Sequence, residues 1–123
     1  MSIDTRPAPE YIYKITTGLL WAEAETSGIV PPMPIDEQDG YMHFSTAGQV
    51  AETLRLHFKG QSDLALLRVR LADIAAGVKW EPSRGGALFP HLYASLPTAA
   101  IAAVHKVAVA ENGACDLPEM PDV

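Results

Sequence analysis

Cysteine is nearly absent from the 123-residue chain, in which Cys115 is the only one. A single thiol leaves no internal disulfide and no cysteine cluster for a zinc site. The sequence also has no H-x-x-x-H or H-E-x-x-H pair, so no metal site is predicted. Walker and Rossmann glycine patterns are missing as well, which removes the familiar sequence signals of a nucleotide-binding loop.

Basic charge and long apolar runs are also scarce. Nine Lys and Arg against fifteen Asp and Glu give a formal charge of -6, which argues against general nucleic-acid binding because such binding needs a basic surface. No segment approaches the roughly 20 apolar residues of a membrane helix. Residues 1–6 lack the apolar core of a signal peptide. We therefore expect a cytoplasmic protein without membrane association.

The length fits one domain over residues 1–123. A hydrophobic fraction of 48% is ordinary for a globular protein, so a packed core is expected. Residues 1–9 contain Pro7 and Pro9 and are interpreted as a loose leader, and residues 111–123 as a frayed tail. The ordered core is expected from about residue 10 to about residue 110.

The pattern of β-branched, aromatic and turn residues predicts an α+β fold with about six strands and two helices. Residues 101–109 are ambiguous between helix and strand, and their alternation favours a strand. Pro90 should confine its strand to a sheet edge or a bulge, and the prolines of residues 29–38 suggest a stiff connector. The expected strands are 11–16, 41–44, 64–71, 78–81, 88–93 and 101–109. The expected helices are 19–25, capped by Thr16 or Thr17 and ended by Gly28, and 50–58.

The stretch from Asp39 to Val50 carries the first candidate site. A turn at Asp39-Gly40 leads into a short strand, and Thr46 with Gln49 forms a capping box before the next helix. His43 and Ser45 therefore lie at a strand-to-helix junction, where free N–H groups favour an anion. His43 can bind a phosphate or move a proton; the alternative is a half-buried histidine bonded to a carbonyl.

Capping already accounts for Thr46, and Ser45 is interpreted as structural for the same reason. A role for Ser45 as a hydrolytic nucleophile is not supported, because no G-x-S-x-G elbow surrounds it. No Asp is obviously placed in the sequence to orient His43.

A second candidate cluster surrounds the glycines Gly85 and Gly86. It combines a carboxylate, a guanidinium, an imidazole and a phenol, which is the mixture expected at a polar pocket rim. The guanidinium could clamp a carboxylate or phosphate. The alternative is an ordinary surface hairpin with an exposed arginine and a packing tyrosine. The four residues are Glu81, Arg84, His91 and Tyr93.

Three blocks of the sequence resemble a known family, the small bacterial proteins grouped as domain of unknown function 952 (DUF952). They are Tyr11-Ile-Tyr-Lys-Ile-Thr, Asp39-Gly-Tyr-Met-His-Phe-Ser-Thr with Gln49-Val50, and Phe89-Pro-His-Leu-Tyr. The likeness spans residues 10 to 110. It implies a fold similar to the ADP-ribosyltransferases, with two small, mostly antiparallel sheets and a few helices around an NAD-sized cleft. The family has no assigned reaction.

The comparison with that superfamily implies roles for several residues. His43 resembles the strand histidine of RNA 2′-phosphotransferases, and Phe44-Ser45-Thr46 resembles a Ser-Thr-Ser strand in which Ala47 replaces the last serine. Lys14-Ile15-Thr16 stands where transferases often carry His-Gly-Thr. No clear Glu-x-Glu or Gln-x-Glu pair is available for the catalytic carboxylate, which leaves Glu81 as the candidate.

Three functional hypotheses follow. The first is an NAD- or nucleotide-binding protein that catalyses ADP-ribosyl or phospho-group transfer, with His43 and Glu81 as catalytic residues. The second is a non-catalytic module that binds a small acidic metabolite or a partner protein. The third is a hydrolase with His43 or His91 as general base, which a carboxylate within reach of either histidine would favour. The expected ligand-binding residues are Lys14, Thr16, Tyr41, Ser45, Thr46, Arg84, His91 and Tyr93.

Overall fold

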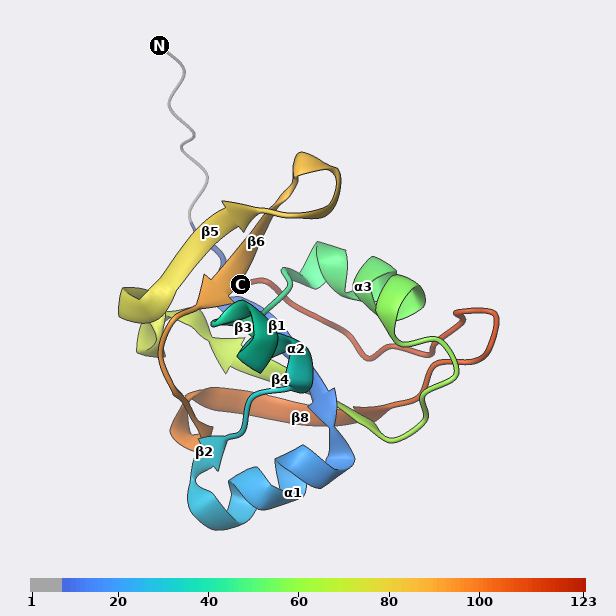
Figure 1. Ribbon diagram of the computed structural model, residues 1–123, viewed down its shortest axis with the longest axis horizontal. Coiled ribbons are helices and arrows are strands. Elements are labelled where there is room, and N and C mark those ends of the chain that lie inside the picture. Colours follow the sequence, from blue (N-terminus) through green and yellow to red (C-terminus); the bar gives the residue numbers. More distant parts are fainter. Residues whose placement is uncertain (1–7) are drawn as a thin grey trace.

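The computed structural model describes residues 8–123, apart from the side chain of Arg84. Within them the chain forms three small antiparallel sheets and three α-helices, so the α+β class is confirmed, with one more sheet than the two expected (Figure 1). The expected loose leader lies almost wholly outside the described residues. The helices are α1 (Gly18–Ser27), α2 (Pro34–Asp39) and α3 (Val50–His57).

The three sheets differ in size. The largest has the strand order β1-β4-β8, the smallest pairs β2 with β7, and the third has the order β3-β6-β5. No described helix is both long and apolar enough to cross a membrane. The strand bounds are β1 (Tyr11–Thr17), β2 (Ile29–Val30), β3 (Met42–His43), β4 (Leu64–Arg70), β5 (Val78–Pro82), β6 (Leu88–Leu92), β7 (Leu96–Pro97) and β8 (Ile101–Val107).

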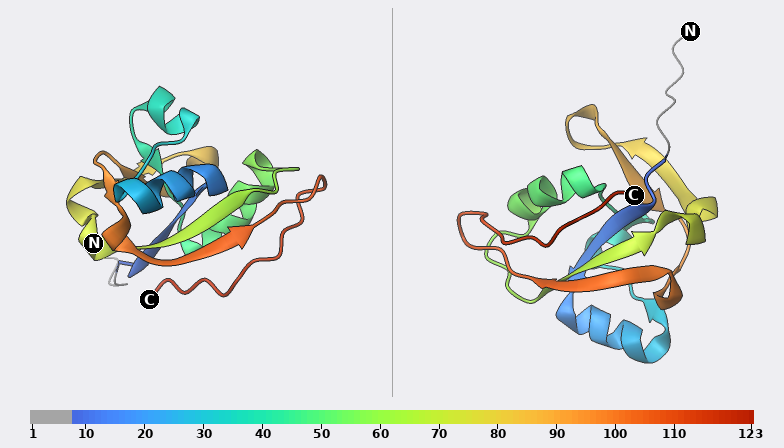
Figure 2. Two further views of the ribbon diagram at one scale, coloured as in Figure 1. Left: turned by 90° about the horizontal axis from the view of Figure 1, so that it is seen from below. Right: turned by 180° about the vertical axis from the view of Figure 1, so that it is seen from behind.

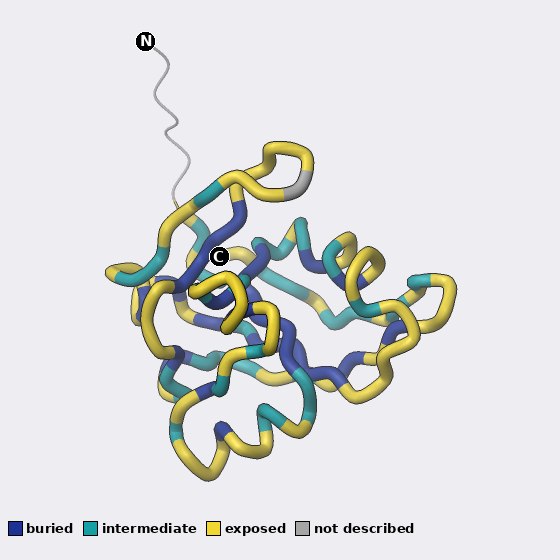
Figure 3. The backbone as a smooth tube through the Cα atoms, in the orientation of Figure 1, coloured by how far each residue is buried: buried dark blue, intermediate teal, exposed yellow. Residues whose placement is uncertain are grey.

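Side chains alternate along the strands of the β1-β4-β8 sheet, so its two faces contribute to two different apolar clusters. Ile12 of β1 belongs to one apolar cluster, whereas Tyr13 and Ile15 belong to a second cluster that α3 completes with Val50 and Leu54. Figure 3 shows the resulting run of buried positions through the middle of the molecule. β1 is therefore held on both faces, and it fixes the positions of Lys14 and Thr16.

The ends of α1 follow the expected signals. Thr17 stands before the helix in an extended conformation, and its side chain accepts a hydrogen bond from the Leu20 N–H at 3.1 Å. Gly28 follows the last turn with φ of 84° and donates to the carbonyl of Ala24. A left-handed residue of this kind favours glycine, which is why the helix ends there.

Replacing Thr17 with Ala should lower the free energy of unfolding by about 1 kcal/mol, because the Leu20 N–H loses its acceptor. Urea denaturation of the wild type and the variant measures the change. Thr26→Ala, on the exposed part of the same helix, is the control and should not destabilise. Equal midpoints for Thr17→Ala and the wild type would contradict the capping role.

The proline-rich connector contains more structure than the sequence predicts. Pro34 occupies the first turn of α2, where the missing N–H has no partner to lose, and the helix ends at Gly40 with φ of 82°. β2 precedes this helix and pairs with β7, although neither strand exceeds two residues. The connector therefore contains a short helix that ends just before β3.

β6 is the middle strand of its sheet, so the prediction that Pro90 would confine it to an edge is wrong. Pro90 lies beside Phe44, just beyond the short pairing of β3 with β6. There the Phe44 N–H donates to the Pro90 carbonyl at 3.0 Å. Pro90 has no N–H, so the second hydrogen bond of this pair, from Pro90 to Phe44, cannot form. The N–H and C=O of one residue point to the same neighbouring strand, so the hydrogen bonds between β6 and β5 are unaffected.

The last residues are packed rather than frayed. Cys115, Leu117 and Met120 contact the second apolar cluster. The Tyr13 hydroxyl donates to the carbonyl of Pro121, and the Tyr11 N–H donates to the carbonyl of Asp122 at 3.2 Å. Figure 2 shows this segment running back from β8 toward β1. The sequence suggested a tail because the segment has no regular secondary structure.

Candidate functional site

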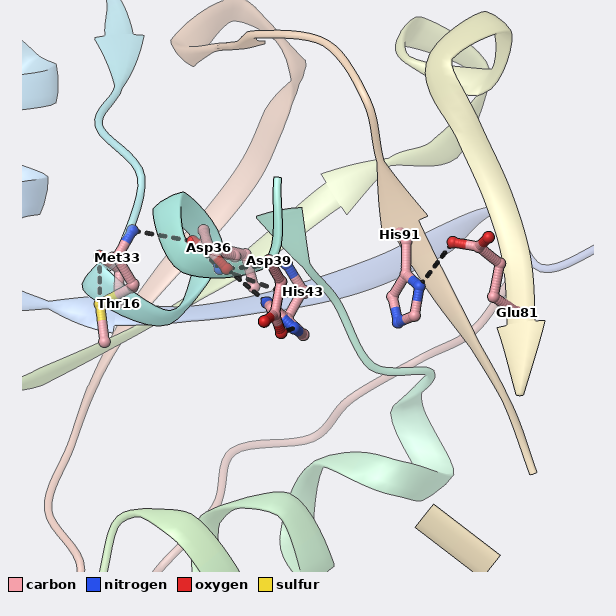
Figure 4. Close-up of polar contacts among 8 residues, drawn as sticks. Thr16, Met33, Asp36, Asp39, His43, Glu81 and His91 are labelled. Carbon is pink, nitrogen blue, oxygen red and sulfur yellow. Dashed lines mark hydrogen bonds and ion pairs between the residues drawn. The ribbon is translucent and has the colours of Figure 1, made fainter. Parts of the chain in front are cut away.

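The two histidines singled out from the sequence face each other across two strands. His43 of β3 and His91 of β6 are directly paired in the register, which places both side chains on one face of the sheet. Their ring centroids are 5.6 Å apart in an edge-on arrangement. Figure 4 shows the two imidazoles, with separate carboxylates reaching each of them.

His43 is held by Asp36 of α2. The Nδ1 atom lies 2.7 Å from Asp36 Oδ1, and the same oxygen accepts the His43 backbone N–H at 3.0 Å. The sequence reading that no Asp was placed to orient His43 is therefore wrong. It failed because α2 lies in a stretch interpreted as a connector.

The Asp36 carboxylate is buried, and both of its oxygens accept hydrogen bonds. Its second oxygen, Oδ2, accepts from Lys14 Nζ at 2.7 Å and from the Met33 N–H at 2.8 Å. Burial raises the pKa of Asp36, but the hydrogen bonds from His43 and the charge and hydrogen bond of Lys14 outweigh it and lower that pKa to about 2. The carboxylate is therefore a permanent anion at neutral pH.

Lys14 neutralises this buried carboxylate. Only 2% of the residue is exposed, and its Nζ also donates to the His43 carbonyl at 3.0 Å. Burial lowers the pKa of Lys14, whereas Asp36 acts in the opposite direction. Lys14 is predicted from the sequence to contact a ligand, and in the structure its ammonium group forms an ion pair with Asp36.

The other nitrogen of His43 also meets a carboxylate. Nε2 lies 2.9 Å from Asp39 Oδ2, and the two side chains are 32% and 33% exposed. Asp39 is the last residue of α2, one turn before His43. His43 is thus placed between a buried carboxylate and a solvent-facing one.

His91 has a carboxylate partner on the neighbouring strand. Its Nδ1 lies 2.8 Å from Glu81 Oε1, and the same oxygen accepts the Tyr93 hydroxyl. The hydrogen bonds from Tyr93 and His91 lower the pKa of Glu81, and the bond to Glu81 raises the pKa of Tyr93 to about 12. His91 itself is 3% exposed. Three members of the second sequence cluster therefore meet in space.

Tyr41 completes the group by packing on His91. The two rings stack with centroids 4.2 Å apart and an angle of 21° between their planes. Tyr41 also lies 4.7 Å from the ring of His43 and 5.2 Å from that of Tyr93. Its pKa is raised by burial and by the nearby Asp39 and Glu81. Tyr41 is expected from the sequence to bind a ligand; in the structure its ring stacks on His91.

Both histidines line a cavity of about 550 Å³. The cavity lies between β1, α2 and α3, and its wall is largely apolar and aromatic. Ser45 contributes a hydroxyl that lies 3.2 Å from the hydroxyl of Thr53 on α3. The other lining residues are Tyr13, Lys14, Ile15, Met33, Pro34, Ile35, Phe44, His57, Phe58, Gln61, Ser83 and Phe89.

Four of the proposed ligand contacts, Thr16, Tyr41, Thr46 and Tyr93, are not among the residues that line this cavity. Thr16 is fully buried, and its hydroxyl donates to the Met33 sulfur at 3.6 Å. Thr46 donates its backbone N–H to the Gln49 side chain at 3.0 Å, which is one half of the expected capping box. The side chain of Arg84 lies outside the described residues. Within that described part, no three His, Cys, Asp or Glu residues are grouped to hold a metal ion.

Comparison with known proteins assigns the chain to a family. Residues 15–104 match the model of the family described as "Protein of unknown function (DUF952)". The chain belongs to the DUF952 family. The matched range contains both histidines with Asp36, Asp39 and Glu81, and it ends before the packed C-terminal segment.

Solved structures agree with this DUF952 assignment. The crystal structure of CC0527 from Caulobacter crescentus is 35% identical, covers 86% of this chain and 93% of that one, and superimposes with a TM-score of 0.80. The solution NMR structure of CC0527 gives 36% identity over 85% and 90% of the two chains, with a TM-score of 0.74. No curated protein matches the chain. The likeness to ADP-ribosyltransferases stays a prediction.

The site of this DUF952 protein includes two carboxylates that the sequence reading missed. Asp36 and Asp39 both belong to α2, and a helix there was signalled by Pro34 followed by Asp36 and Glu37 in the first turn. Ending that helix at Gly40 would have placed Asp39 one turn from His43. The available signal was thus a helix start, which the neighbouring prolines obscured.

Proposed function

We propose that this protein is a hydrolase in which His91 is the general base for a small molecule bound in the cavity. The observation that carries the proposal is the Glu81 carboxylate at 2.8 Å from His91 Nδ1. A carboxylate at this nitrogen orients the imidazole and stabilises the imidazolium that forms during proton transfer. Of the three functions considered from the sequence, this arrangement favours the hydrolase.

The chemistry follows from the two ring nitrogens. Ionised Glu81 can only accept, so Nδ1 carries the proton and Nε2 is the basic nitrogen. Figure 4 shows this second nitrogen pointing away from Glu81. Nε2 takes a proton from water as the water oxygen attacks the electrophilic centre of the ligand. The imidazolium then returns that proton to the leaving group, which departs with the electrons of the broken bond.

The cavity supplies the binding energy. A volume of about 550 Å³ falls within the range of small-molecule sites. Phe44, Phe58 and Phe89 offer an apolar wall, and the hydroxyls of Ser45 and Thr53 offer hydrogen bonds on the same surface. A ligand with an apolar or planar body and one polar, hydrolysable end matches these walls.

NAD and related nucleotides stay among the ligands to be tested, because the fold resemblance predicts them. Glu81 would then have to stabilise an oxocarbenium-like ribose. Its Oε1 atom already accepts from both His91 and Tyr93. That arrangement supports a role in orienting the base over direct contact with a ribose.

A ligand panel tests the proposal. Thermal shift and calorimetry with NAD, ADP-ribose, nicotinamide and simple sugar phosphates identify binding, and mass spectrometry of each mixture identifies products. We expect at least one ligand to be converted by the wild type and by His105→Gln, a change on β8 outside the cavity lining. His91→Gln should bind it without conversion. Binding without conversion by the wild type would instead support a non-catalytic module.

A further inference from the structure

We infer that His43 Nε2 is the binding point for an anionic oxygen of the ligand, and that Asp39 occupies this point in the free protein. The inference rests on the proposed ligand-binding role of the cavity, whereas it does not need His91 to be the base. It narrows the ligand to a small molecule with a carboxylate or phosphate group.

The Nδ1 proton of His43 is fixed by Asp36. That carboxylate accepts from four donors, namely Lys14 Nζ, the Met33 N–H, and the backbone and ring N–H groups of His43. An ionised carboxylate has no proton to give, so Nδ1 must be the donor at the 2.7 Å contact. The orientation of the ring is thereby set from the buried side.

The Nε2 atom faces a second acceptor. Asp39 Oδ2 lies 2.9 Å away, and it too can only accept when ionised. When the ring is the protonated imidazolium, both ring nitrogens carry a proton, so the contacts with Asp36 and Asp39 are both hydrogen bonds. In that form Nε2 is a charged N–H donor, and the group that best satisfies it is an anionic oxygen.

The two carboxylates are not equivalent. The Asp36 side chain is 1% exposed and is held by four donors, whereas Asp39 is 33% exposed. Among the described residues, the hydrogen bond to His43 is the one that engages the Asp39 side chain. An exposed ion pair of this kind is weak, since water competes for both partners. Asp39 can rotate into solvent at little cost, and Asp36 cannot.

Exchange of Asp39 for a ligand anion also preserves the charge around His43. Asp36, Glu81 and Lys14 lie nearby, with Tyr41 and His91 packed against the ring. A ligand carboxylate or phosphate replaces one negative oxygen at Nε2 with another. A neutral ligand offers no such exchange and leaves Asp39 in place. His43 is itself among the residues that line the cavity.

Titration with simple anions tests this directly. The probes are inorganic phosphate and acetate, and the readout is the nitrogen and proton NMR signals of the His43 imidazole in wild-type protein, Asp39→Ala and Glu37→Ala. Glu37 is an exposed neighbour on α2, so its change removes the same charge without touching His43. If Asp39 occupies Nε2 nine-tenths of the time, its removal should tighten anion binding about tenfold.

The expected pattern is tighter binding of phosphate, acetate or both at His43 in Asp39→Ala, and wild-type affinity in Glu37→Ala. Equal affinities in all three proteins, or the same gain in both variants, would overturn the inference. The preferred probe separates a phosphate ligand from a carboxylate ligand. His105→Gln, a change on β8 outside the cavity lining, should bind the anion as the wild type does. The His43 signals report anion binding whether or not any ligand is hydrolysed, so failure of the hydrolase proposal and failure of this inference are separate results.

Discussion

Replacing Asp36 with Asn should lower the free energy of unfolding by roughly 3–5 kcal/mol, which is the loss observed when one partner of a buried ion pair is removed. Lys14 is 2% exposed, and without the Asp36 charge its ammonium is left unpaired in the interior. The amide also offers one acceptor oxygen in place of two, so at least one of the four present donors loses its partner. Urea denaturation at neutral pH measures the change.

Lys14→Met combined with Asp36→Asn is the matched control. The double variant removes both charges and keeps similar side-chain volumes, so it should recover a large part of the stability lost in Asp36→Asn. A double variant that is no more stable than the single one would show that the unpaired ammonium is not the cause. Loss of acceptors for the backbone N–H groups would then account for the destabilisation.

Acid sensitivity gives a second measure of the same contact. The pKa of Asp36 falls from 3.8 to about 2 on folding, so the folded state is stabilised by the ionised form. This stabilisation is complete above about pH 4 and disappears as the pH falls toward 2, and it amounts to roughly 2 kcal/mol. The difference in stability between the wild type and Asp36→Asn should narrow by about that amount over this range.

Replacing Glu81 or His91 with Gln should lower the turnover number of whichever ligand the cavity hydrolyses by roughly 10²- to 10⁴-fold, the usual contribution of general acid–base catalysis. Glu81→Gln can no longer stabilise the imidazolium, and its amide can present N–H rather than an acceptor to His91 Nδ1. KM should change much less, because the contact matters most in the transition state. Steady-state kinetics separates the two parameters.

Tyr93→Phe is the control for this second prediction. It removes the hydroxyl that donates to Glu81 and leaves the Glu81 contact with His91 in place. Its turnover should therefore lie much closer to that of the wild type than to that of Glu81→Gln. A full loss in Tyr93→Phe, or full activity in Glu81→Gln, would remove the reason for assigning His91 as the base.

The parts of the fold that the sequence predicts are those with local signals. β1 is read from its run of β-branched and aromatic residues, and α1 from the Thr17 cap and from Gly28. The cluster of Glu81, His91 and Tyr93 could also be predicted, because Glu81 and His91 lie on adjacent strands of one hairpin and Tyr93 follows directly after β6. In each case the residues that decide the structure are close in sequence.

The remaining features depend on contacts between distant segments. Asp36 matters because it meets Lys14, twenty-two positions earlier in the chain. β6 lies in the middle of its sheet because β3 pairs with its second edge, which no feature of Pro90 could reveal. The last segment packs because its apolar side chains cover the second cluster. Local propensity contains no information on such partners.

The pairing of His43 with His91 limits how this protein can diverge. Side chains alternate along a strand, so a one-residue slip would set Pro90 or Leu92 opposite His43 and turn His91 to the far side of the sheet. An insertion or deletion within β6 before His91 must therefore comprise an even number of residues if His91 is to stay on the same face of the sheet as His43. Relatives that share this chemistry should obey a rule of parity there, while the loops outside the strands vary in length.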